Sequence, residues 1–296
     1  PPSPPPPPPP PTPRHGVRRQ RQMCIRDRDS YVPGDIGHIL IVPPRDLQRF
    51  APLQTGRRRV LTTADVLPAQ FRQVSGSEKL WVDRRGWPIR GWVMQQLVKL
   101  SANRATDAEL LLFADSDLQF LRGFDLEAFY RGGKLRLHRI PEAMNEGRHR
   151  RWHSRAGKLL GDNRDYFGSD FVGQLITWRR SNLVALQAHI EESVGKPWYV
   201  AVSRSLDISE YILYGSFVEH ILGDEQNGHF YDSRELCHCC WFDYQARDLL
   251  HGRTTLSTDA LALLVQSNLD LEVSQESAVL NAALAQKHNL QPGALS

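Results

Sequence analysis

Runs and periods of apolar residues divide the chain into alternating strands and helices. The most distinct strand is the unalternated run LLLFA at residues 110–114, which is typical of a strand covered on both faces in an α/β sheet. Just before it, residues 91–101 place Val93, Leu97 and Leu100 at positions i, i+4 and i+7, the spacing of an amphipathic helix. The pattern therefore predicts an α/β domain.

Shorter patterns predict the remaining elements. Helix 181–193 has an apolar face and Ser181 as a candidate N-cap. The other predicted elements are strands at 38–42, 59–62, 134–138, 171–178 and 261–266 and helices at 45–50, 124–129, 208–221 and 271–286. No internal repeat is visible. Residues 29–296 are long enough for one large domain with its own core.

The first 28 residues differ from the rest in composition. An almost unbroken proline tract is followed by basic residues, which predicts an extended, solvated chain with few contacts to the domain. Residues 22–28, QMCIRDR, back-translate to the transposon mosaic end used in sequencing libraries, which indicates a translated adapter joined to a truncated gene. We therefore interpret residues 1–28 as an artefactual, disordered Pro/Arg-rich tail and leave them out of the fold prediction.

This exclusion changes the meaning of the charge. Six arginines and one aspartate in residues 1–28 contribute +5 to the formal net charge of +4, which leaves −1 for the remainder. The basic tail is then no argument for a nucleic-acid partner, and none is expected. No apolar run approaches the ~18 residues of a membrane helix, and no secretory signal is visible. We expect no transmembrane segment and a cytoplasmic location.

The cysteines point the same way. Cys237, Cys239 and Cys240 cluster around His238. A structural zinc site needs four ligands, usually from two pairs, and no second cysteine pair exists. Reduced thiols of a cytoplasmic protein are the favoured interpretation.

Candidate chemistry lies where the strand at 110–114 ends. Strands of α/β sheets place their ligands at the carboxyl end, and residues i and i+2 of an extended segment point to the same side. Asp115 and Asp117 can then converge on one divalent cation, and hard carboxylate oxygens suit Mg²⁺ or Mn²⁺. The alternative is that both aspartates are ordinary turn residues after a strand.

Three segments carry a resemblance to a known family: GWVMQQLVKLSANRATDAELLLFADSDLQFLRGFD, DYFGSDFVGQLITWRRSNLVAL and SEYILYGSFV. They resemble an uncharacterised bacterial family described as glycosyltransferases with the nucleotide-sugar-binding GT-A fold, over residues 29 to about 267. The resemblance implies a single domain with a mixed, mostly parallel central sheet flanked by helices. There is also one departure: in that fold a first strand and helix hold the base and ribose, and here we expect that first strand to be replaced by the artefactual segment.

The resemblance implies a hexosyltransferase-type enzyme. It would transfer a sugar from a nucleotide-sugar donor to an unknown glycan or small-molecule acceptor. Asp117 would bind the metal that bridges the donor diphosphate, while Asp115 would contact the metal or the ribose hydroxyls. The ion neutralises the negative charge that develops on the departing nucleoside diphosphate. His229 and His238 are candidates for a third metal ligand, and the alternative for each is an ordinary histidine.

Further site candidates flank these aspartates. Glu210, beside Ser209 and two tyrosines, is the candidate general base for an acceptor hydroxyl, although it may equally be the capped first turn of a helix. Residues before the strand can line the donor site, with Lys99 as a phosphate counter-charge, or form a solvated helix face: Arg90, Gln95, Gln96 and Lys99. Four rings are candidates for stacking on a sugar or, alternatively, core residues: Trp152, His153, Trp178 and Trp198.

Two other function classes compete with this prediction. A phosphatase of the haloacid dehalogenase type also has two aspartates after a strand, but the motif lies early in its domain and a threonine or valine follows. Here Leu118 and Gln119 follow, deep in the chain. The other class is a non-catalytic module that binds nucleotide sugars or glycans, which the missing first strand favours.

Overall fold

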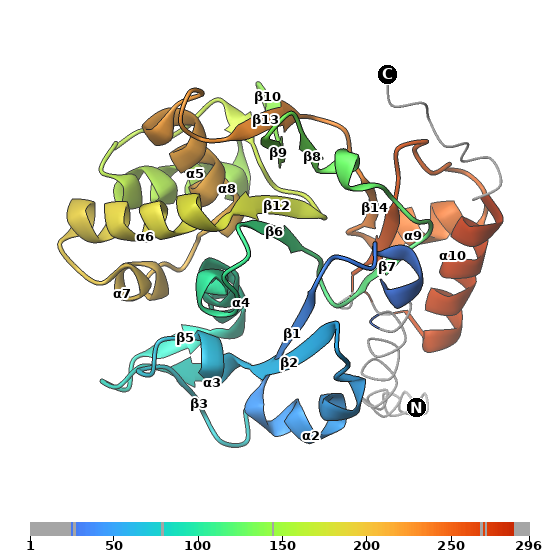
Figure 1. Cartoon of the computed structure of the whole chain (residues 1–296), viewed down its shortest axis with the longest axis horizontal. Coiled ribbons are helices and arrows are strands. Elements are labelled where there is room, and N and C mark those ends of the chain that lie inside the picture. The colour runs from blue at the N-terminus through green and yellow to red at the C-terminus, as the bar shows by residue number, and fades with distance from the viewer. Residues whose placement is uncertain are drawn as a thin grey trace, which may run out of the picture.

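The structure is a computed structural model in which residues 25, 28–77, 80–143, 145–266, 269 and 271–286 are described. Strands and helices are mixed along the chain, with several strands following one another directly (Figure 1). The strands are β1 His38–Val42, β2 Arg58–Thr62, β3 Arg72–Gln73, β4 Leu80–Val82, β5 Pro88–Arg90, β6 Leu110–Phe113, β7 Leu118–Phe120, β8 Tyr130–Arg131, β9 Lys134–His138, β10 Ile140–Pro141, β11 Ser169–Asp170, β12 Ile176–Arg179, β13 His229–Asp232, β14 Cys237–Cys240 and β15 Ala262–Val265. The helices are α2 Leu47–Phe50, α3 Thr63–Val66, α4 Gly91–Leu100, α5 Gly147–Leu160, α6 Arg180–Val194, α7 Trp198–Ser203, α8 Glu210–Phe217, α9 Asp243–Leu250 and α10 Val273–Gln286.

The protein is a mixed α/β fold, as predicted, but its strands form several small sheets. β6 pairs antiparallel with β12, and β15 pairs parallel with β14 and antiparallel with β7. The other parallel pairs in the described part of the chain are β1–β2 and β9–β13. The single, mostly parallel central sheet of the prediction is not found among these residues. Strands β12 and β7 instead pair antiparallel with β6 and β15.

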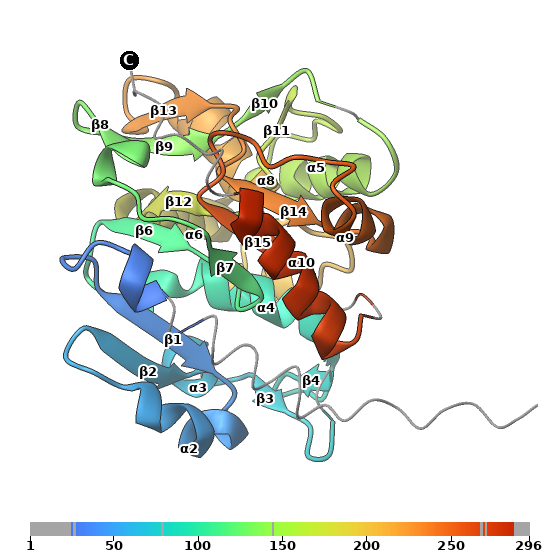
Figure 2. The same ribbon diagram turned by 90° about the vertical axis from the view of Figure 1, so that its right-hand side faces the viewer.

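The largest core cluster packs helices against the β6–β12 pair. Val93, Leu97 and Leu100 of α4 are each at most 1% exposed, so the predicted apolar face is the buried one. The same cluster contains Trp178 of β12 and Tyr214 of α8, whose rings stack 4.6 Å apart. A smaller cluster lies under α9 and α10, which cover one face of the β14–β15–β7 sheet (Figure 2). The first cluster therefore fixes α4 and α8 relative to the end of β6.

A glycine allows α8 to approach the loop before β12. A Cβ added at Gly215 would lie 2.1 Å from a ring carbon of Phe171, a side chain that is 1% exposed. We expect Gly215→Ala to lower the free energy of unfolding by about 1–3 kcal/mol, because a buried ring cannot shift freely. Chemical denaturation checks this. Gly34→Ala, where a Cβ meets nothing within 4 Å, is the control, and equal stability of the two variants would contradict the close contact.

Two residues of the amino-terminal segment pack against the domain. Ile25 is 3% exposed in a cluster with Leu40, Val42, Phe50 and Leu53. Arg28 is 6% exposed, and its Nη2 donates to the carbonyl oxygen of Asp115 at 2.5 Å. The prediction of few contacts is therefore wrong for Ile25 and Arg28. Residues 1–24, 26 and 27 lie outside the described residues, so their predicted disorder stays a prediction.

Candidate functional site

Lys99 is the centre of a buried polar cluster at the end of β6. Its Nζ lies 3.1 Å from Asp115 Oδ1 and 3.1 Å from Glu210 Oε1, and it donates to the Tyr211 phenol oxygen at 2.5 Å. The Lys99 and Glu210 side chains are 18% and 7% exposed, whereas that of Asp115 is 35% exposed. Three residues chosen separately from the sequence are thus brought together.

Three elements position this cluster. Lys99 stands in the last turn of α4, and Asp115 follows the end of β6 by two residues. Glu210 is the first residue of α8, where Ser209 is the N-cap and its hydroxyl accepts from the Ile212 amide at 3.4 Å. A carboxylate in the first turn of a helix is favoured by the helix dipole. Glu210 therefore begins its helix and also faces Lys99.

Attraction between these groups outweighs the cost of their burial. For Lys99, burial opposes the charged form, but the Tyr211 oxygen and the carboxylates of Glu210 and Asp115 raise its pKa well above the usual value. For Asp115, burial likewise opposes ionisation, but the Lys99 ammonium and a hydrogen bond from Gln174 lower its pKa. An ammonium group beside the ionised Asp115 carboxylate is thus the stable arrangement near neutral pH.

The DSD motif is a turn rather than an extended segment. The Leu118 amide donates to the carbonyl oxygen of Asp115 at 3.2 Å, and Ser116 and Asp117 form the turn between them. The predicted convergence of the two carboxylates rested on an extended backbone, so that argument is wrong. Asp117 is half-buried in the turn. The turn interpretation, left open by the sequence, describes the backbone of this motif.

The two aspartates differ in how well they suit a metal. Asp115 Oδ1 faces the Lys99 ammonium, and its Oδ2 accepts from Gln174 Nε2 at 3.0 Å. A divalent cation at Asp115 would be repelled by Lys99, so Asp115 does not fit as a metal ligand in this arrangement. Among the described residues, no group of three or more His, Cys, Asp or Glu side chains could hold a metal ion. Asp117 fits as a single carboxylate ligand, since Mg²⁺ commonly takes its remaining ligands from water and phosphates.

The other donor-site candidates lie on α4. Arg90, the N-cap residue of α4, and Gln95 are exposed, in keeping with the solvated-face alternative. Gln96 is only 2% exposed, and within the described part of the chain both its amide oxygen and its amide nitrogen lack a hydrogen-bond partner. Gln174, which holds Asp115, was not among the candidates, because no local pattern marks a contact over 59 residues.

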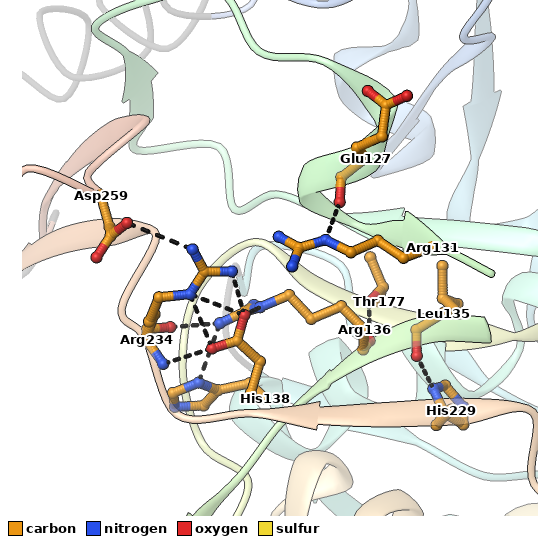
Figure 3. A network of polar contacts seen from close by, with 10 residues as sticks. Glu127, Arg131, Leu135, Arg136, His138, Thr177, His229, Arg234 and Asp259 are labelled. Atoms are coloured by element: carbon orange, nitrogen blue, oxygen red, sulfur yellow. Dashed lines mark hydrogen bonds and ion pairs between the residues drawn. The ribbon is translucent and has the colours of Figure 1, made fainter. Parts of the chain in front are cut away.

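His229 is placed in the core instead of at the aspartates. It is 3% exposed, its Nε2 lies 2.9 Å from the Tyr214 hydroxyl, and its Nδ1 lies 3.0 Å from the Leu135 carbonyl oxygen (Figure 3). Burial lowers the pKa of His229 to about 4. Since both ring nitrogens already have partners, a metal ion could bind His229 only if these hydrogen bonds broke.

The remaining candidates on β14 and among the aromatic residues are mostly internal. His238 lies on β14, where burial lowers its pKa, and the three cysteines around it are free thiols. Trp178, Trp198 and His153 are all at most 7% exposed, so the core interpretation describes them. Trp152 is only half-buried.

A second polar cluster surrounds Arg136 of β9 (Figure 3). Arg136 is 1% exposed, its Nε donates to Asp232 Oδ2 at 3.2 Å, and its Nη2 donates to the carbonyl oxygen of Arg234. Arg234 also binds Asp232, at 2.7 Å, and reaches the half-exposed Asp259 at 3.5 Å. Burial and the Arg136 charge lower the pKa of His138, beside Arg136, to about 4. Arg136 is buried and its guanidinium group has hydrogen-bond partners, which indicates a structural role for this cluster.

Comparison with known proteins places the chain in a family. A family model described as a family of unknown function, DUF6492, matches residues 29–287. The chain belongs to the DUF6492 family. No curated protein matches the chain. The predicted membership of an uncharacterised family is confirmed for this DUF6492 protein, and in its described residues no helix is long and apolar enough to cross a membrane.

Proposed function

We propose that this DUF6492 protein is a metal-dependent glycosyltransferase with a GT-A-like domain. Its donor would be a nucleotide sugar, and its acceptor a glycan or another small molecule. The observation that carries the proposal is the meeting of Lys99, Asp115 and Glu210 at the carboxyl end of β6. Ligand sites of α/β folds lie at such strand ends, and buried, charge-coupled groups cluster at functional sites.

The two aspartates have different roles in this proposal. Asp117 would hold a Mn²⁺ or Mg²⁺ ion, whose chemistry is to neutralise the charge on the departing diphosphate. Asp115 keeps a 35% exposed side chain beside Lys99 and Gln174, so it can accept a hydrogen bond from a ribose hydroxyl. Lys99 is paired with carboxylates, so it fixes their positions rather than binding phosphate directly.

Glu210 is the proposed general base. The proton of the acceptor hydroxyl would pass to a Glu210 carboxylate oxygen as the hydroxyl oxygen forms its bond to the sugar and the nucleoside diphosphate leaves. Lys99, 3.1 Å away, holds Glu210 in place and occupies one of its carboxylate oxygens. This ion pair is the observation that favours a second candidate function, a non-catalytic module that binds nucleotide sugars.

Replacement of Asp117 tests the donor site. We expect Asp117→Ala to abolish Mn²⁺-dependent binding of nucleoside diphosphates, measured calorimetrically with uridine and guanosine diphosphate, because the metal loses its protein carboxylate. Asp125→Ala, which removes an exposed carboxylate eight residues along, should bind like the wild type. Retained affinity of Asp117→Ala with unchanged metal dependence would remove the donor-site assignment.

Turnover separates the two candidate functions. Mn²⁺-dependent hydrolysis of a panel of nucleotide sugars by the wild type would support the glycosyltransferase. Binding of the same compounds without any hydrolysis or transfer would instead support the binding module.

A further inference from the structure

An aromatic platform, which we define as Trp92 and Trp152, lies away from the Lys99 cluster. Trp92 is the second residue of α4 and Trp152 belongs to α5. Their rings stack with centroids 6.1 Å apart and an interplanar angle of 28°. Trp92 nevertheless remains 39% exposed. Large aromatic side chains usually bury most of their surface, so an exposed stacked pair leaves ring surface open to a ligand.

Polar groups surround the platform. The indole Nε1 of Trp152 is buried and has no hydrogen-bond partner within the described residues. The His149 ring lies 4.8 Å from Trp152, and its Nδ1 is 3.3 Å from Asp170 Oδ2. The platform therefore combines the exposed Trp92 ring with a nearby imidazole–carboxylate pair. A hydroxyl group both donates and accepts hydrogen bonds, so it matches this combination.

The platform and Lys99 lie on the same side of α4. Trp92, Gln96 and Lys99 stand at positions i, i+4 and i+7, which lie on the same side of a helix. Seven residues of helix span about 10 Å. Gln96, between the two ends, is 2% exposed and its amide lacks partners in the described part of the chain. The platform and Lys99 are therefore about 10 Å apart along the helix axis, with the buried Gln96 amide between them.

We propose that Trp92 and Trp152 form an acceptor subsite that binds a pyranose ring of a carbohydrate. The apolar face of the sugar ring packs on Trp92, while its hydroxyls bind the His149–Asp170 pair. The Arg148 guanidinium, whose Cζ lies 6.0 Å from the centroid of the Trp152 ring, offsets the Asp170 carboxylate, and surroundings of mixed charge suit a neutral, hydroxyl-rich ligand. This inference rests on the proposed function only in that the bound sugar would be the acceptor, because binding at the platform requires neither donor nor metal.

Saturation-transfer NMR with cellobiose, maltose and N,N′-diacetylchitobiose, without nucleotide or metal, tests the subsite. We expect the wild type to bind at least one of them and Trp92→Ala to bind it at least 10-fold more weakly. Trp87→Ala is the matched control, since Trp87 is 57% exposed, packs under Arg204 and lies before α4. It should bind like the wild type. Circular dichroism of Trp92→Ala checks that this variant folds like the wild type.

The other outcomes would overturn either the subsite or the proposed function. No binding of the three disaccharides, or equal binding by Trp92→Ala and the wild type, would overturn the subsite. Tighter binding of free uridine or adenosine that is lost in Trp92→Ala would overturn it too, because the platform would then stack nucleobases. Disaccharide binding together with metal-independent nucleotide binding would contradict the proposed function and leave the subsite standing.

Discussion

Asp232→Ala is expected to lower the free energy of unfolding by about 3–5 kcal/mol, because it leaves a buried guanidinium group without its counter-charge. Arg136 is 1% exposed and donates to Asp232 at 3.2 Å. Burial opposes the ionisation of Asp232, but hydrogen bonds from Arg234 and the charge of Arg136 lower its pKa. Urea denaturation at neutral pH measures the loss, provided that the slope of the transition is unchanged.

Two further variants isolate the cause. Asp259→Ala removes a 40% exposed carboxylate 3.5 Å from Arg234, and exposed pairs of this kind contribute at most about 1 kcal/mol. Combining Asp232→Ala with Arg136→Met removes both buried charges and should regain much of the stability, since apolar replacements of buried ion pairs are often neutral. A single Asp232→Ala variant as stable as Asp259→Ala would show that Arg136 finds another partner.

Lys99→Met should have the second largest effect on stability. It removes the cation between Asp115 and Glu210 and leaves two carboxylates in a partly buried site. We expect a loss of about 2–3 kcal/mol at pH 7, below the range for fully buried pairs because Asp115 is still partly solvated. Lys134→Met, at an exposed lysine of β9, is the control and should cost under about 0.5 kcal/mol.

The stability of the wild type and that of Lys99→Met should depend differently on pH. In the wild type the pKa of Asp115 is lowered, so its contribution is present above about pH 3.9 and is lost as the pH falls through the folded-state value. The raised pKa of Lys99 keeps its contribution up to about pH 10.4 and beyond. In Lys99→Met the partly buried Asp115 carboxylate loses its cation, so its pKa rises and stability should increase from pH 7 toward pH 5. Parallel pH profiles for both proteins would contradict the ion pairs.

Strong local patterns predicted the elements that hold the site. The apolar spacing over residues 91–101 corresponds to α4, Gly91–Leu100, and the run at 110–114 contains β6, Leu110–Phe113. Lys99, Asp115 and Glu210 were each selected from the sequence, but their mutual ion pairs were not. The contact between residues 99 and 210 depends on how α8 packs relative to α4, and no local period encodes it.

The predicted elements differ from the structure where tertiary contacts set the backbone conformation. The predicted strand at 171–178 begins only at Ile176, because Leu175 has a φ of 55° and Gly173 lies against the His138 ring. Helix α5 was not predicted, since its outward face carries arginines and its buried face includes His153 and Gly157. In both places tertiary contacts, rather than propensity, decide the conformation.

The contact of Arg28 with Asp115 bears on where to cut the gene for expression. The family match begins at Asp29, one residue after a guanidinium group that donates to the carbonyl of the DSD turn at 2.5 Å. A fragment that begins at Asp29 would contain the whole family match but would lack Arg28, which donates a hydrogen bond to that turn. The limit of sequence similarity therefore excludes two side chains, Ile25 and Arg28, that pack against the domain, and activity assays on a trimmed fragment need the longer version beside them.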